Sequence, residues 1–256
     1  MKKIRLMAVV SLLSVCAGAF AQFTNSSSST SKNSSEGWNS VWVQYNPSTF
    51  NVDIKDVDNQ NFTGLSVGYS QAFSISKSHP LFVEVGLGLQ YSFYTNDDGK
   101  WTGIDEEDIE DARKEGDYDP KEKFNMFSVK VPVALTYKFD LNNSNVSLLP
   151  FVGVNLRYNL SGKGKYEWNL GSDFKDDIKG SQYEEAFEDR DFNLFDKKDM
   201  GSSDATWKRF QIGWQIGLNA HIGSNLILGA SYGKDFSEIY KKCKISSFNI
   251  NLGYKF

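Results

Sequence analysis

Four charged residues interrupt segments that are otherwise built from apolar and small side chains: Glu84, Lys130, Lys138 and Arg157. Each lies on the polar face of a segment in which every second residue is apolar, and a charge placed there must find a partner. Lys130 and Arg157 lie at similar distances from the connection between their segments. We expect Glu84 to supply their anion, with Lys138 as its second partner. We predict that the four residues form an ion-pair network that fills and plugs the interior of the folded domain. The alternative is that this interior is a gated conduit.

Catalytic chemistry finds little support in the residue types. His79 and His221 are the two histidines, and both lie beside short connections, far from the long loops where a serine–histidine or aspartate–histidine site would be needed. Cys243 is the one cysteine expected in the mature chain, so neither an internal disulfide nor a cysteine-built metal site is expected. We predict no enzyme activity, no catalytic residue, no cofactor and no metal ligand set.

The segment 95–124 is strongly acidic. It lacks the ligand spacing and central glycine of an EF-hand loop, so the simplest interpretation is a solvated loop with a short helix near 104–114. The alternative is divalent-cation binding that bridges to anionic lipopolysaccharide. The residues of this segment that could contact a partner are Trp101, Asp105, Glu106, Glu107 and Asp108.

The segment 161–206 is the longest connection and is rich in aromatic residues. Aromatic side chains at this density can pack on one another, and they can equally anchor a partner. We expect self-packing first, and Trp168 is the candidate for contact with a partner.

The first 21 residues have the features of an export signal. Lys2, Lys3 and Arg5 precede an apolar run, and Ala19-Phe20-Ala21 provides a cleavage pattern. Cys16 raises the alternative of a lipoprotein leader, although the residue before it is not small. Residues 22–37 are rich in serine and asparagine and predict a disordered periplasmic tether. The net charge of −4 becomes more negative without the leader, which argues against a nucleic-acid partner.

From residue 38 to residue 256 the chain predicts one all-β domain. Apolar and polar residues alternate with a period of two, most clearly from Leu81 to Phe93, and such segments form strands with two different faces. No window reaches the roughly 20 apolar residues of a membrane-spanning helix, so any membrane crossing must use strands. We expect eight strands, at about 38–45, 62–73, 81–94, 125–139, 148–160, 207–222, 226–233 and 245–256.

The connections between these strands alternate in length. The first, third, fifth and seventh are each longer than their neighbours. Transmembrane barrels place short turns in the periplasm and long loops outside the cell. The pattern therefore predicts an eight-stranded antiparallel up-and-down transmembrane β-barrel with long extracellular loops and both termini in the periplasm.

The final segment alternates from Phe248 to Phe256 and resembles the signal that the bacterial barrel-assembly machinery recognises, with Tyr254 and Phe256 as the implied contacts. The domain from residue 38 onward resembles the small bacterial outer-membrane β-barrel superfamily of OmpA-type, OmpX-type and PorT-like proteins. That resemblance implies a location in the outer membrane of a Gram-negative cell, with outer-membrane lipid, lipopolysaccharide and the assembly machinery as partners. It rests on pattern rather than on a motif, so it implies fold more firmly than activity.

These features predict a non-enzymatic barrel scaffold that displays acidic loops for surface interaction, including contact with a protein partner, or for envelope integrity. A PorT-like part in a secretion or envelope-assembly complex is the first alternative. A small barrel enzyme and a soluble lipocalin-like carrier are lesser alternatives, and the carrier would need an apolar interior and a polar outer surface.

Overall fold

The computed structural model describes residues 36–53, 59–96, 104–141, 145–199 and 207–256. The predicted leader, almost all of the predicted tether and Trp101 lie outside these residues. The elements are β1 (Trp38–Tyr45), β2 (Ser48–Val52), β3 (Gln60–Ser74), β4 (Leu81–Asn96), α2 (Glu106–Glu115), β5 (Lys121–Tyr137), β6 (Phe139–Asp140), β7 (Val146–Glu167), α3 (Ser172–Ile178), η2 (Glu184–Phe187), β8 (Arg190–Asn193), β9 (Phe210–Ile222), β10 (Leu226–Asp235) and β11 (Cys243–Lys255).

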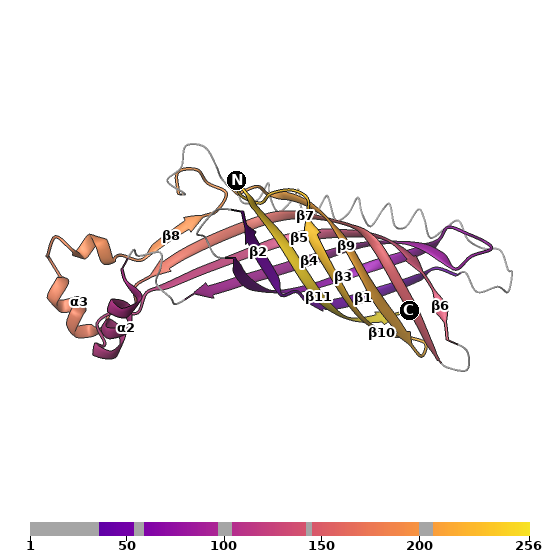
Figure 1. Cartoon of the computed structure of the whole chain (residues 1–256), viewed down its shortest axis with the longest axis horizontal. Coiled ribbons are helices and arrows are strands. Elements are labelled where there is room, and N and C mark those ends of the chain that lie inside the picture. The colour runs from indigo at the N-terminus through magenta and orange to yellow at the C-terminus, as the bar shows by residue number, and fades with distance from the viewer. Residues whose placement is uncertain (1–35, 54–58, 97–103, 142–144, 200–206) are drawn as a thin grey trace. The chain divides into compact units, whose positions relative to one another are not determined.

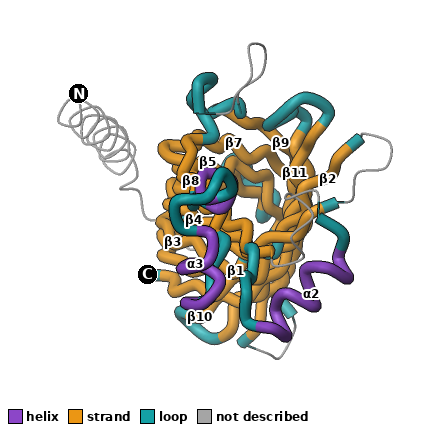
Figure 2. The backbone as a smooth tube through the Cα atoms, turned by 90° about the vertical axis from the view of Figure 1, so that its left-hand side faces the viewer, coloured by secondary structure: helices purple, strands orange, loops and turns teal. Residues whose placement is uncertain are grey.

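The strands form a closed antiparallel ring of eight (Figures 1 and 2). Its order is β1, β11, β10, β9, β7, β5, β4 and β3, and β1 pairs with both β11 and β3 to close it. β2 continues β1 and pairs with the same two neighbours. Pro47 interrupts this wall strand because proline has no N–H for the ladder. The predicted eight-stranded up-and-down barrel is confirmed.

The two faces of the wall differ sharply in polarity. Outward side chains are apolar and exposed, as for Val43 and Leu65 at 52% each. Inward positions carry buried polar groups such as Ser70, Lys130 and Gln211. This arrangement suits a wall that faces lipid outside and a polar lumen inside, and it is the reverse of what a lipocalin-like carrier needs. Within the described residues, no helix is long and apolar enough to cross a membrane.

The two ends of the barrel differ in their connections. One end carries the connections from β3 to β4, from β5 to β7 and from β9 to β10 together with Trp38 and Phe256, and we call it the short-turn end. The other end carries the connections from β2 to β3, from β4 to β5, from β7 to β9 and from β10 to β11, and we call it the long-loop end. The predicted alternation of connection lengths is confirmed.

Several strands run further than the sequence predicts. β2 adds to the first wall strand, β5 begins at Lys121 and β7 continues to Glu167. At the long-loop end, β4, β5 and β7 extend beyond Phe210, the first residue of β9, and β8 pairs with β7 there. Polar residues in these extensions weaken the apolar alternation, so the pattern underestimates their length. Pro132 lies on the lumen side, where the β4–β5 ladder is interrupted.

Candidate functional site

The lumen is closed by apolar side chains at the short-turn end. Trp38, Ala72, Phe82 and Leu149 form a buried cluster. The rings of Trp38 and Phe82 lie 4.7 Å apart, and the His221 ring meets Trp38 edge-on at 5.0 Å. His221 is buried here and His79 lies in the turn 75–80, so both histidines lie at the end predicted from the sequence.

The middle of the lumen is a polar chamber. Lys130 Nζ donates a hydrogen bond to Gln44 Oε1 at 2.8 Å and lies 5.5 Å from the centre of the Trp42 ring. Glu84 accepts a hydrogen bond from Ser70 Oγ at 2.5 Å. Glu84 and Lys130 line the same cavity of about 60 Å³, which has room for water.

Arg157 lies beside Lys130 across the β5–β7 pair, which confirms their predicted similar depth. The anion of Arg157, however, is Asp235 and not Glu84. Arg157 Nη2 lies 2.5 Å from Asp235 Oδ2, and both side chains are buried. The sequence missed Asp235 because the seventh strand was expected to end two residues earlier. Asp235 continues the inward series of Ser231 and Gly233, and that alternation could have revealed it.

The predicted partner of Lys138 is also wrong. Lys138 Nζ lies 3.0 Å from Asp140 in the turn at the short-turn end. The residue opposite Glu84 on β5 is Ala134, and Lys138 lies four positions further along the chain, just beyond the end of β5. Among the described residues, the four predicted charges therefore do not form one ion-pair network. Arg157 has a carboxylate inside the lumen, while Lys130 and Glu84 bind neutral groups.

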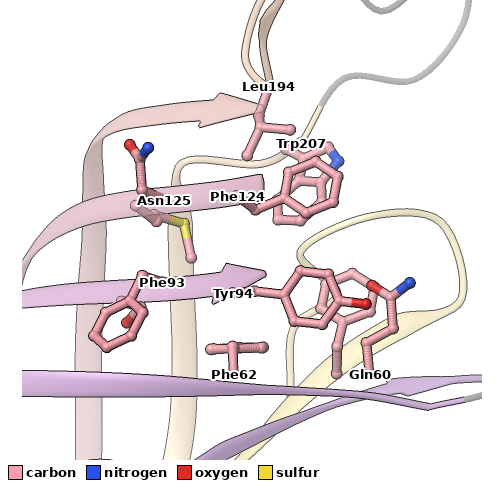
Figure 3. Close-up of a pocket in the computed structure, with 11 residues that line it drawn as sticks. Gln60, Phe62, Phe93, Tyr94, Phe124, Asn125, Leu194 and Trp207 are labelled. Carbon is pink, nitrogen blue, oxygen red and sulfur yellow. The ribbon is translucent and has the colours of Figure 1, made fainter. Parts of the chain in front are cut away.

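At the long-loop end the lumen is closed by a second apolar cluster. Phe50, Met126, Ile239, Cys243 and Ile245 are buried together. Partly buried residues pack on them, namely Val52, Phe62, Phe195, Trp207 and Tyr240. Figure 3 shows Tyr94 and Phe124 beside Trp207 around a small pocket in this region. An apolar cluster thus lies at each end of the polar chamber.

Beyond this cluster, α2 forms the predicted helix of the acidic segment. Asp105 is its N-cap residue, and Glu106, Glu107 and Asp108 lie exposed in its first turn, where the helix dipole favours negative charge. Gly116 ends the helix with φ of 82°, a conformation that suits glycine. Ile109 is fully buried, so α2 has one apolar and one carboxylate-rich face.

Four aromatic rings join the two long loops. Tyr118 lies 5.8 Å from Trp168, 5.5 Å from Phe174 and 5.6 Å from Phe187, and Trp168 lies 4.7 Å from Phe187. Backbone hydrogen bonds run from Asp119 N to Trp168 O at 2.9 Å and from Gly171 N to Asp117 O at 2.8 Å. We call residues 104–120 and 168–189 the loop module. Trp168 is buried inside it, which corrects the expectation that this ring contacts a partner.

Ion pairs fix the base of the loop module. Asp119 Oδ1 accepts a hydrogen bond from Arg113 at 2.7 Å, and its other oxygen lies 2.8 Å from Lys121 Nζ. Burial acts to raise the pKa of Asp119, but the hydrogen bonds and charges of Lys121 and Arg113 outweigh burial and lower the pKa below its ordinary value.

The predicted assembly signal lies on the outer wall. Tyr254 and Phe256 are exposed, at 54% and 62%. Phe256 also exchanges backbone hydrogen bonds with Asn39, which ties the end of the chain to β1. No group of three or more histidine, cysteine, aspartate or glutamate residues suited to a metal ion occurs among the described residues.

We compared the chain with known proteins in sequence and in structure. No curated relative matches the sequence. Among solved structures, Ail, the attachment invasion locus protein of Yersinia pestis, in complex with the heparin analogue sucrose octasulfate, is 17% identical. That alignment covers 86% of this chain and 99% of Ail, with a TM-score of 0.43. Neisserial surface protein A is 13% identical, with 85% and 97% covered and a TM-score of 0.39. The outer membrane enzyme PagL is 9% identical, with 82% and 97% covered and a TM-score of 0.38.

These TM-scores are too low to support a statement about activity. A family model described as the outer membrane protein beta-barrel domain matches residues 7–256, nearly the whole chain. The protein is therefore located in the outer membrane. The chain belongs to the outer membrane protein beta-barrel domain family.

Proposed function

We propose that this protein is a non-enzymatic outer-membrane scaffold that displays the loop module outside the cell for contact with a partner. The observation that carries the proposal is the construction of the module. Two loops far apart in sequence are locked together by the Tyr118, Trp168, Phe174 and Phe187 rings. Ordering these loops costs conformational entropy, and a loop that only connects two strands does not need to be ordered. A fixed shape that exposes carboxylates is suited to recognition.

The chemistry of the module indicates a cationic partner. The exposed face of α2 carries Glu106, Glu107, Asp108, Glu110 and Asp111, and its basic residues lie at the other end of the helix. Such a face favours encounter with a basic protein surface by long-range attraction. Divalent cations that bridge these carboxylates to lipopolysaccharide are the alternative ligand.

The polar chamber fits the role of a scaffold. Apolar clusters close both of its ends, and eight-stranded barrels have an interior that side chains fill. We therefore expect a plugged lumen and no steady conductance. In biogenesis, the outward-facing Tyr254 and Phe256 would be the contacts of the barrel-assembly machinery.

Surface labelling in intact cells tests the orientation. Glu107→Cys reports the loop module and Lys77→Cys reports the turn 75–80, both in a Cys243→Ser background that removes the buried thiol. A membrane-impermeant maleimide should modify only the cysteine at position 107. Labelling of position 77 alone would overturn the proposed orientation.

Crosslinking tests the contact itself. A photoreactive residue at position 107 should capture a specific partner in intact cells, and the triple variant Glu106→Gln, Glu107→Gln, Asp108→Asn should reduce that capture. A photoreactive residue at position 77 is the matched control. Capture only at position 77 would favour the alternative, a component of a secretion or envelope-assembly complex.

A further inference from the structure

Outward aromatic side chains near the long-loop end flank a stretch of the barrel wall that has no aromatic side chain. Tyr232 on β10 lies opposite Phe248 on β11. The Phe248 N–H donates to Pro47 O at 2.9 Å, and Thr63 on β3 lies opposite Phe93 on β4. Along this row the outward residues are therefore aromatic, aromatic, proline, threonine and aromatic. Aromatic side chains on the outer wall of a membrane protein are enriched at the level of the lipid headgroups, and we expect the gap between these rings near that level.

The gap is a groove of about 520 Å³ in the outer wall. Tyr232 and Phe248 lie on one side of it and Phe93 on the other, while the short side chains of Thr49 and Thr63 lie between them. Thr49 Oγ1 donates a hydrogen bond to Asn61 Oδ1 at 2.8 Å. The described residues that line the groove include hydroxyl and amide groups but no charged side chain.

The groove continues into the wall because two strands separate. β3 and β4 pair only as far as Thr63 and Phe93. Beyond that point β3 pairs with β2, while β4 pairs only with β5 among the described residues. The separation leads to the pocket in Figure 3, which shares Phe62, Phe93 and Tyr94 with the groove.

Stacked rings lie behind this opening. The rings of Tyr94 and Phe124 are 6.0 Å apart with 25° between their planes, and those of Phe124 and Trp207 are 6.2 Å apart with 27°. Trp207 also stacks on Phe50 at 5.3 Å. The opening therefore has an aromatic wall, while the groove itself keeps its hydrogen-bonding groups.

These features distinguish among the parts of a membrane lipid. Acyl chains need no hydroxyl or amide groups, and phosphate calls for lysine or arginine, neither of which occurs among the described residues that line the groove. A sugar ring offers hydroxyls for groups such as Thr49 and Asn61 and an apolar face for Phe93 or Phe248. A volume of about 520 Å³ lies within the usual range of ligand sites.

We propose that the gap between Phe248 and Phe93 binds a sugar ring in the headgroup of a glycolipid of the outer leaflet. The threonine and asparagine groups bind its hydroxyls, and the flanking rings contact its apolar face. The choice of leaflet rests on the orientation in the proposed function. Binding itself does not depend on that orientation or on a partner of the loop module.

The test fills the gap. Thr63→Tyr places an aromatic ring between Pro47 and Phe93, which occupies the groove. Ile216→Tyr is the matched control, because Ile216 lies opposite Tyr232 and is 53% exposed outside the groove. Thr49→Val removes one hydroxyl while keeping the shape of the side chain. Retention of the heat-dependent shift in gel mobility shows that each variant is folded.

Native mass spectrometry of the full protein released from detergent micelles measures binding of purified lipid A, with phosphatidylglycerol as the anionic competitor. Wild type and Ile216→Tyr should bind lipid A equally, and Thr63→Tyr should bind it about tenfold more weakly. Thr49→Val should fall between them. Equal binding by Thr63→Tyr would overturn the proposal, as would equal competition by phosphatidylglycerol, which would show recognition of phosphate. Should Thr63→Tyr not fold, unchanged binding by Thr49→Val would overturn it instead.

Discussion

The barrel wall and the loop module bury opposite kinds of side chain. The wall exposes Val43 and Leu65 and buries Lys130 and Arg157, whereas the loop module buries Trp168 and exposes the carboxylates of α2. The surrounding solvent explains the difference, because lipid surrounds the wall and water surrounds the module. The wall is held by backbone ladders and polar contacts, and the module by packed rings. The two regions should therefore respond to different perturbations.

Loss of the Arg157 charge should have the largest effect, and it should act on the wall. Arg157→Met leaves Asp235 buried without its cation, which we expect to lower the free energy of unfolding by about 3–5 kcal/mol. Urea unfolding in lipid vesicles, followed by heat-dependent gel mobility, measures the change. The double variant Arg157→Met, Asp235→Leu should regain much of the loss. Equal stability of the single variant and wild type would show that the pair is not needed to hold the wall.

Truncation of a buried ring should act on the module instead. Trp168→Ala removes contacts to Tyr118 and Phe187, and we expect a local loss of about 3 kcal/mol. Hydrogen exchange should quicken in residues 104–120 and 168–189 while the wall remains protected. Tyr183→Ala is the control, because this ring is 59% exposed. Loss of protection throughout the wall would contradict the separation of the two regions.

A glycine substitution tests how the wall accommodates its own aromatic ring. A Cβ atom at Gly68 would lie 2.2 Å from Trp42 Cζ2 and 2.6 Å from Leu87 O. Gly68→Ala should therefore displace Trp42 and lower the free energy of unfolding by about 1–3 kcal/mol. Urea unfolding and the shift in tryptophan emission measure both effects. Val67→Ala, at a lipid-facing position, is the control and should leave the emission of Trp42 unchanged.

The sequence predicts the wall far better than the module. Alternation in segments such as Leu81–Phe93 has a period that only a strand satisfies, and it correctly placed Lys130 and Arg157 toward the lumen. The pairing of Arg157 with Asp235 joins β7 to β10, which are not neighbours in the ring. That contact depends on side chains crossing the lumen, and strand order alone does not reveal it.

The module illustrates the opposite case. Composition predicted the helix of the acidic segment and the self-packing of the aromatic segment, because both depend on residues that are close together in the sequence. It did not predict that Tyr118 would pack with Trp168, because the sequence of one loop contains no pattern that indicates contact with the other loop. Asp105, Glu106, Glu107 and Asp108 are exposed, so their contact with a partner stays a prediction, whereas Trp168 is buried.

The smallest effect should be that of acid on the ion pairs at the base of the loop module. The lowered pKa of Asp119 means that its ion pairs with Arg113 and Lys121 contribute stability above the unfolded-state value near pH 4. That contribution is lost as the pH falls through the lower folded-state pKa. Because the Asp119 side chain is about one-third exposed, we expect less than about 1 kcal/mol.

Protease cleavage within residues 104–120 should increase as the pH falls below about 4. An acid-active protease measures this increase. Asp119→Asn should be cleaved more readily than wild type at neutral pH and should show little further change in acid. Asp176→Asn, on the exposed side of α3, is the matched control and should follow wild type. An acid response in Asp119→Asn as large as that of wild type would assign the effect to the other carboxylates of α2. In that case the acidic surface, rather than the ion pairs at its base, would govern the stability of the module.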